Sequence, residues 1–220
     1  MNRFAGFILL AACLLLPAIV FSQGKTYTIV FLNSRSEAEE LDEARGKQLM
    51  EAHLDNIGRL AEEGKLLIAG PFLGGGGMFV MNTSSIEEAR TWIATDPAVQ
   101  AGRWNIELLP YTPRRGSICP VKGENEYVEY TFVRFNAIVE KFNASSYPQL
   151  IRQHEAFIKQ NIASSDIVTE AIFGPNEGGV LVLRNKADRD TFLSDPAVQN
   201  GLIDVDIRKL YIARTSFCEP

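Results

Sequence analysis

Residues 53–72 have the sequence HLDNIGRLAEEGKLLIAGPF, and this stretch belongs to a pattern that occurs twice in the chain. The pentapeptide DPAVQ follows at 96–100 and returns unchanged at 195–199. The other matching positions are His53 and His154, Gly70-Pro71 and Gly174-Pro175, and Tyr111 and Tyr211. Since every offset lies close to one hundred residues, the sequence predicts two tandem copies of one structural unit.

The first 22 residues are predicted to be a secretory signal peptide. Arg3 gives a short positive start, residues 7–21 are almost wholly apolar, and the small Ser22 is the expected last residue removed. Two alternatives remain open, namely lipoprotein cleavage before Cys13 and an uncleaved membrane anchor. The expected location is therefore periplasmic or secreted, or the cell envelope for a lipoprotein anchored at Cys13.

The charge and hydropathy patterns exclude two classes of partner. The chain has 22 Lys and Arg against 27 Asp and Glu, a formal net charge of −5, and it contains no basic run. Nucleic acid is therefore not an expected partner. After the leader, no apolar stretch approaches the length of a membrane span. The remaining chain is long enough for one large or two small cores.

Two cysteines lie outside the leader, at equivalent points of the two copies. Cys119 follows the last expected strand of the first copy, and Cys218 follows that of the second. An even pair at matching positions in an exported protein favours one disulfide, Cys119–Cys218. Free or unrelated thiols are the alternative.

Both copies show the order strand, helix, strand, strand, helix, strand. Ser85 and Glu88 form a capping box that opens the second helix of copy one, and Asn185 with Asp188 is expected to open its counterpart. The expected strands of the first copy are 27–32, 65–69, 78–81 and one that begins at 104; those of the second are 127–135, 167–173, 180–183 and 202–212. This order is the split β-α-β motif of ferredoxin-like folds.

A single ferredoxin-like sheet leaves one apolar face bare, and a second copy can cover that face. The sequence therefore predicts an α+β fold of two tandem ferredoxin-like (βαββαβ) repeats that form an internal pseudo-dimer within a monomer. The predicted division is a signal peptide at 1–22, repeat 1 at 25–112, a linker at 113–125, repeat 2 at 126–215 and a tail at 216–220.

Four side chains are candidates for proton transfer. The chain has two histidines, His53 and His154, and each occupies the same place in its repeat. Asp96 and Asp195 recur with them, and a carboxylate next to an imidazole would orient it for acid–base chemistry. The alternative is structural, because both histidines lie within apolar helix faces and Asp before Pro is a common helix cap.

Other sites are not expected from the sequence. The glycine run 74–77 precedes a strand rather than a helix, which indicates a hairpin loop and not a phosphate cradle. Two histidines so far apart, without clustered cysteines, do not predict a zinc site. We therefore expect no cofactor and no metal.

The first copy resembles the YciI-like (YCII-related) family. The resemblance rests on an early helical histidine, the Glu-Glu-Gly-Lys-Leu-Leu segment leading to Ala69-Gly70-Pro71, and Asp-Pro followed by glycine; it covers most of 25–111 and is weaker in copy two. It implies a unit related to dimeric α/β barrels with a His/Asp-centred active site, and a few relatives act on chlorinated or lactone rings. Some relatives carry Asp-Gly-Pro where this chain has Ala69 and Phe173, so one possible acid is missing here.

Two functions follow as expectations. The first is an exported protein that binds a small molecule or has an accessory role in the cell envelope. The alternative is a small lyase or isomerase that uses His/Asp acid–base catalysis on an organic acid or a ring compound.

Overall fold

A computed structural model describes residues 24–121, 123, 125–138, 140, 143–174 and 178–218. The expected leader, including Cys13, and Pro175 of the second Gly-Pro pair lie outside the described residues.

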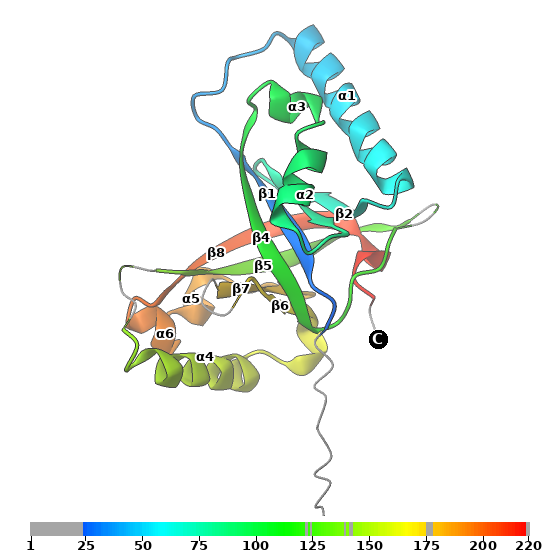
Figure 1. The fold of residues 1–220 in the computed structure, drawn as a ribbon. Coiled ribbons are helices and arrows are strands. Elements are labelled where there is room, and N and C mark those ends of the chain that lie inside the picture. Colours follow the sequence, from blue (N-terminus) through cyan, green and yellow to red (C-terminus); the bar gives the residue numbers. More distant parts are fainter. Residues whose placement is uncertain are drawn as a thin grey trace, which may run out of the picture.

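Within the described part of the chain, eight strands form one antiparallel sheet with the order β2-β3-β1-β4-β6-β7-β5-β8 (Figure 1). The strands are β1 (Tyr27–Ser34), β2 (Leu66–Pro71), β3 (Gly77–Met81), β4 (Trp104–Arg115), β5 (Tyr127–Ala137), β6 (Ile167–Ile172), β7 (Gly178–Leu183) and β8 (Ile203–Ala213). The helices are α1 (Glu43–Glu62), α2 (Ile86–Ile93), α3 (Pro97–Gln100), α4 (Tyr147–Asn161), α5 (Arg189–Phe192) and α6 (Pro196–Gln199), with 3-10 turns η2 (Ser164–Asp166) and η3 (Arg214–Ser216).

The sheet closes on itself through two equivalent seams. At one seam β4 of the first repeat pairs with β6 of the second, with Thr112 opposite Ile172. At the other, Phe72 after β2 bridges to Leu210 of β8, and the Leu73 N–H donates to the Lys209 carbonyl at 2.9 Å. The predicted α+β fold of two ferredoxin-like repeats forming an internal pseudo-dimer is therefore confirmed, with edge-to-edge pairing as well as facing sheets.

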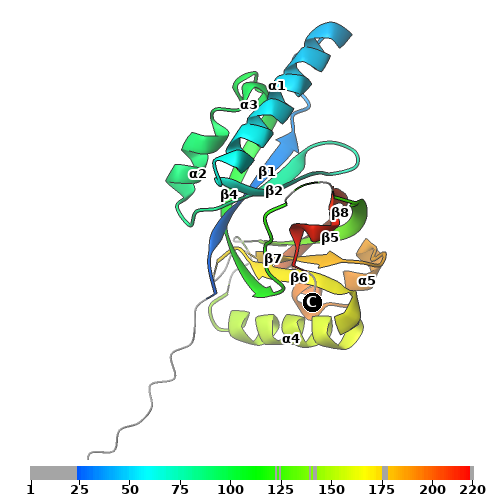
Figure 2. The same ribbon diagram turned by 90° about the vertical axis from the view of Figure 1, so that its right-hand side faces the viewer.

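Three apolar clusters follow from this closure. The largest lies inside the barrel and takes side chains from both repeats, including Phe31, Val80, Phe132 and Val182. The other two lie between the sheet and the helices of each repeat, because alternate strand residues point outward. Helices α1–α3 and α4–α6 accordingly lie on opposite sides of the strands (Figures 1 and 2).

The strand β4 is longer than the sequence predicts. It continues to Arg115, three residues into the range expected as linker, and contains Pro110 and Pro113. Proline cannot donate a hydrogen bond to a ladder, and the register between β4 and β6 shifts between Pro113 and Arg115. A bulge at a seam thus accommodates residues that are typical of a linker.

The match between Tyr111 and Tyr211 is wrong by one residue. Tyr111 pairs with Tyr27, points into the barrel and is 1 % exposed. In the second repeat Leu210 takes the corresponding inward position, opposite Tyr130, while Tyr211 points outward and is 44 % exposed. Adjacent strand residues face opposite sides, so a one-residue error in alignment reverses the burial.

The helix caps agree with the sequence in the first repeat and only partly in the second. The Ser85 side chain accepts a hydrogen bond from the Glu88 N–H, as predicted. In repeat 2 the corresponding helix α5 has only four residues, and Asp188, rather than Asn185, is its N-cap. The helix α4 begins after Ser146 as expected, but the Ser146 side chain makes no capping bond.

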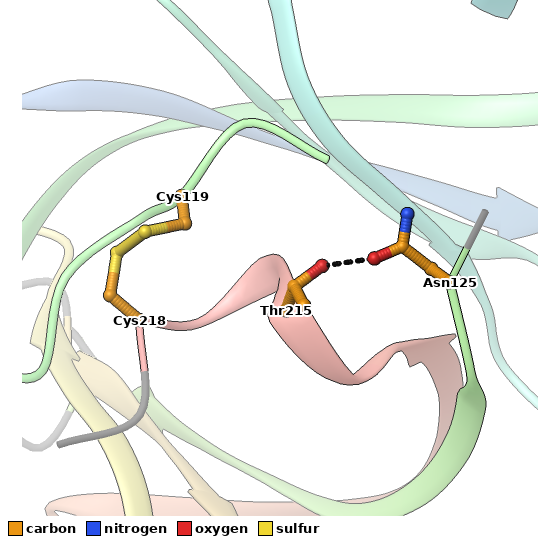
Figure 3. The surroundings of a disulfide bond; sticks show 4 residues. All are labelled: Cys119, Asn125, Thr215 and Cys218. Atoms are coloured by element: carbon orange, nitrogen blue, oxygen red, sulfur yellow. Dashed lines mark hydrogen bonds between the residues drawn. A yellow bond between two sulfur atoms is a disulfide. The ribbon is translucent and has the colours of Figure 1, made fainter. Parts of the chain in front are cut away.

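Cys119 and Cys218 are joined in a disulfide, with their Cα atoms 5.3 Å apart (Figure 3). Backbone bonds hold both segments in place: the Cys119 N–H donates to the Ser216 carbonyl and the Cys218 N–H to the Ser117 carbonyl. The nearby Thr215 hydroxyl also donates to the Asn125 side chain. The C-terminal segment is thereby attached to the connection between the repeats.

None of the helices in the described ranges has the length and apolarity needed to cross a membrane.

Candidate functional site

The first candidate pair lies between α1 and the start of α3. His53 Nδ1 is 2.6 Å from Asp96 Oδ2, and the amide of Asn56 lies 3.4 Å from the same oxygen. The Asp96 side chain is 0 % exposed and that of His53 is 8 % exposed. Trp104 covers the imidazole, with the two ring centroids 4.8 Å apart.

The second pair repeats this geometry between α4 and α6. His154 Nδ1 is 2.5 Å from Asp195 Oδ2, and the exposures of the two side chains are 14 % and 0 %. The edge of Phe135 contacts the imidazole at a centroid distance of 4.8 Å. The structure therefore brings together both residue pairs that the sequence proposes.

Each aspartate has a second role as a helix cap. Asp96 Oδ1 accepts from the Ala98 and Val99 N–H groups, and Asp195 Oδ1 accepts from the Ala197 N–H. An ionised carboxylate only accepts hydrogen bonds, so Nδ1 of each imidazole carries the donated proton. Nε2 of each ring has no hydrogen-bond partner among the described residues, and it is an acceptor when the ring is neutral.

A cavity of about 550 Å³ lies beneath α4, and His154 is part of its wall. The wall is mainly apolar, with side chains such as Phe135, Ile158, Leu181 and Ile203. This volume lies within the range of roughly 300–1,000 Å³ that is typical of small-molecule sites. Tyr147 also lines the cavity, and burial raises the pKa of its phenol.

Charged side chains at the cavity come from both repeats. Arg114 of β4 forms an ion pair with Glu155 of α4 at 2.9 Å. Arg115 donates to the hydroxyl and carbonyl of Ser164 and lies opposite Glu170 in the strand register. The charges around the cavity are therefore mixed, and β4 of repeat 1 contributes to a site that otherwise belongs to repeat 2.

One other sequence feature, the glycine run 74–77, has a structural role. The glycine run forms a tight turn into β3, and Gly76 has a positive φ of 74° close to the Leu32 carbonyl. Across the described residues, no group of three or more His, Cys, Asp or Glu side chains is arranged to hold a metal ion.

The match to known families falls on the first repeat. Residues 28–110 match the family model of the YCII-related domain. This part of the chain is therefore similar to a YCII-related domain. His53, Asp96 and Trp104 lie within the matched range, whereas the cavity and His154 lie outside it. No curated protein matches the sequence of this chain.

Solved structures that superpose on most of this chain include two proteins, each of which carries only a provisional name. One is named as a chlorite dismutase; it is 9 % identical, with a TM-score of 0.48 over 86 % of this chain and 94 % of that one. The other is named as a monooxygenase from Fusobacterium nucleatum, 9 % identical, with a TM-score of 0.41 over 88 % of this chain and 94 % of that one.

The sequence did not indicate the residues that distinguish the two sites. The sequence predicts Trp104 and Ile203 only as strand residues and Arg114 as part of the linker. The signal was present in the alignment of the repeats, because Trp104 and Ile203 each follow the glycine after DPAVQ by two residues.

Proposed function

We propose that this protein binds a small, largely apolar organic molecule in the cavity beneath α4, with His154 as the polar contact. The supporting observation is that His154 lines a cavity of about 550 Å³ while its Nδ1 is held by the fully buried Asp195. The fixed Nδ1 contact directs Nε2 as the acceptor available to a ligand.

A thermal-shift screen of small organic acids and ring compounds tests this proposal. A ligand present at a hundred times its dissociation constant should stabilise the fold by about 2.7 kcal/mol. The shift should disappear in His154→Gln and persist in His53→Gln. A ligand whose shift persists in His154→Gln and disappears in His53→Gln would refute the placement in the second repeat.

A second candidate is acid–base catalysis on the bound molecule, as in a lyase or isomerase. The free Nε2 of His154 and the buried carboxylate behind the ring favour it, since an oriented imidazole can accept and return a proton near neutral pH. A ligand that the wild-type protein both binds and converts would support this function, and His154→Gln should lose the conversion together with the binding. Binding without turnover in the wild type would leave the protein as a binding protein.

We also propose that the protein functions outside the cytoplasm, where the Cys119–Cys218 bond is stable. The bond closes a loop with a sequence separation of 99 residues, which contributes about 4–5 kcal/mol in the chain-entropy model. The intact mass of protein purified from its native compartment should rise by two hydrogens on reduction. Labelling of both thiols in the unreduced protein would contradict this.

A further inference from the structure

We infer that the two His–Asp pairs have different roles: His154 serves a ligand site, and Trp104 closes the corresponding space over His53. The inference rests on the proposed function and assigns ligand binding to the second of the two pairs. It also names Trp104 and Ile203 as the residues that set the difference.

The strand registers show that Trp104 and Ile203 are equivalent positions. Trp104 begins β4 and pairs with Ser34 at the end of β1. Ile203 begins β8 and pairs with Ala137 at the end of β5. Each therefore points toward the helices from the same corner of its repeat.

The side chains at these positions differ in size, although each imidazole also contacts a phenylalanine ring, Phe79 in repeat 1 and Phe135 in repeat 2. The Trp104 indole lies 4.8 Å from the His53 ring, and Phe79 stacks on the same imidazole at 6.1 Å. In the second repeat the smaller Ile203 forms part of the cavity wall beside His154. At this position the indole of Trp104 thus occupies the space next to His53 in repeat 1, whereas the smaller Ile203 leaves the cavity open in repeat 2.

The polar side chains around the two aspartates also differ between the repeats. Asn56 donates to Asp96 and also accepts from Arg59 and Thr95, so the first pair belongs to a hydrogen-bonded network. At the corresponding position of α4 stands Phe157, an apolar residue that is 8 % exposed. Asp195 therefore has His154 as its side-chain partner within the described residues.

The chemistry of the cavity defines the class of ligand. The walls are mainly apolar, and Asp195 holds Nδ1 of His154, so that Nε2 is the nitrogen that accepts a hydrogen bond when the ring is neutral. The complementary ligand has an apolar aliphatic or ring body and one hydroxyl or acidic O–H that donates to Nε2.

Diethyl pyrocarbonate tests the inference without any knowledge of the ligand. The reagent acylates unprotonated imidazole nitrogen, and this chain has two histidines, which peptide mass spectrometry can separate. In the folded, oxidised protein His154 should react roughly tenfold or more faster than His53, because His53 becomes accessible only when the packing opens locally.

Reciprocal substitutions provide the matched controls. Ile203→Trp should slow the modification of His154 to the rate of His53, and Trp104→Ile should raise the rate of His53 toward that of His154. Circular dichroism confirms that each variant is folded; if Trp104→Ile does not fold, the wild-type rates and Ile203→Trp decide the question. Equal rates in the wild type, or a His154 rate unchanged by Ile203→Trp, would overturn the inference.

The outcome is separable from that of the proposed function. Equal histidine rates with a ligand found in the screen would reject the unequal roles and keep small-molecule binding. If the two histidines react at unequal rates but no organic acid or ring compound binds, the difference in access to the two histidines stands and the proposed small-molecule binding is rejected.

Discussion

Asp96 and Asp195 each divide their two carboxylate oxygens between a helix and a histidine. One oxygen caps the short helix that follows, and the other holds the imidazole. The capping bonds fix the carboxylate, and the fixed carboxylate in turn fixes the ring. Each aspartate can therefore cap a helix and orient a histidine at the same time, so the structural role and the chemical role do not exclude each other.

Removing each imidazole should separate stability from binding. His53→Ala removes the partner of a buried carboxylate and leaves a small cavity, so it should lower the free energy of unfolding by about 2–3 kcal/mol while ligand binding persists. His154→Ala should abolish binding and also lower the free energy of unfolding, because it too leaves a fully buried carboxylate without its imidazole partner. Urea unfolding and titration with a ligand from the screen measure both effects. Loss of binding in His53→Ala alone would reverse the assignment.

Glu107 and Arg134 form an ion pair that joins the two repeats at one end of the barrel. Two guanidinium nitrogens of Arg134 donate to Glu107 at 2.8 and 2.7 Å, and the Arg134 side chain is 12 % exposed. The guanidinium also lies 4.1 Å above the Phe31 ring. The hydrogen bonds from Arg134 lower the pKa of Glu107, against an opposing effect of burial.

This pair predicts a pH-dependent contribution to stability. A carboxyl group whose pKa is lowered by folding stabilises the fold above its unfolded pKa, and the effect is lost as the pH falls through the folded pKa. Since Glu107 is 39 % exposed, Glu107→Gln should cost only about 1 kcal/mol at pH 7, and the cost should shrink below about pH 4. Urea unfolding at several pH values measures it, and Glu126→Gln in the exposed pair with Arg214 is the control. A cost independent of pH would contradict the assignment.

At the scale of elements, the residue before β3 and the first residue of β7 are glycines because another strand passes close by. A Cβ on Gly76 would lie 2.2 Å from the Leu32 carbonyl oxygen, and one on Gly178 would lie 1.9 Å from that of Phe135. Both residues also have positive φ, at 74° and 91°. These glycines therefore allow close approach of backbones and do not simply add flexibility.

Gly76→Ala should consequently lower the free energy of unfolding by about 2 kcal/mol or more, through backbone strain and a clash with a carbonyl. Gly46→Ala is the matched control, because Gly46 lies in α1 with nothing near its Cβ position. That change should stabilise the helix by about 0.5–1 kcal/mol. Chemical denaturation compares the two variants. Equal stabilities of Gly76→Ala and the wild type would show that the turn can relax.

The sequence predicts which segments form strands better than it predicts where those strands end. It likewise predicts the two His–Asp pairs better than the side chains that pack around them. Period-2 patterns and the recurring DPAVQ segment place the strands and both His–Asp pairs, since these depend on local chemistry. The extent of β4 depends on pairing with a strand of the other repeat, which lies some sixty residues ahead in the chain. The space beside each imidazole depends on Trp104 and Ile203, which lie far from the histidines in sequence.

At the scale of the whole molecule, the pseudo-two-fold arrangement makes each repeat the missing half of the other. The inner faces of both sheets form one apolar cluster, and the edges β2 and β4 of repeat 1 pair with β8 and β6 of repeat 2. A repeat on its own would expose that inner face and two strand edges to water.

The isolated first repeat, residues 23–118, should therefore not be a stable monomer. Its inner residues Ile29, Phe31 and Val80 are at most 2 % exposed in the whole chain and would lose their cover. Burial of such a face is the main driving force for association, and self-pairing through the same seams would reproduce the barrel from two identical halves. Light scattering after size exclusion should show a homodimer or aggregates for this fragment, whereas the oxidised chain lacking residues 1–22 should be a monomer. A well-behaved monomeric fragment would show that repeat 1 is stable without its partner and that the shared barrel is not needed for its fold.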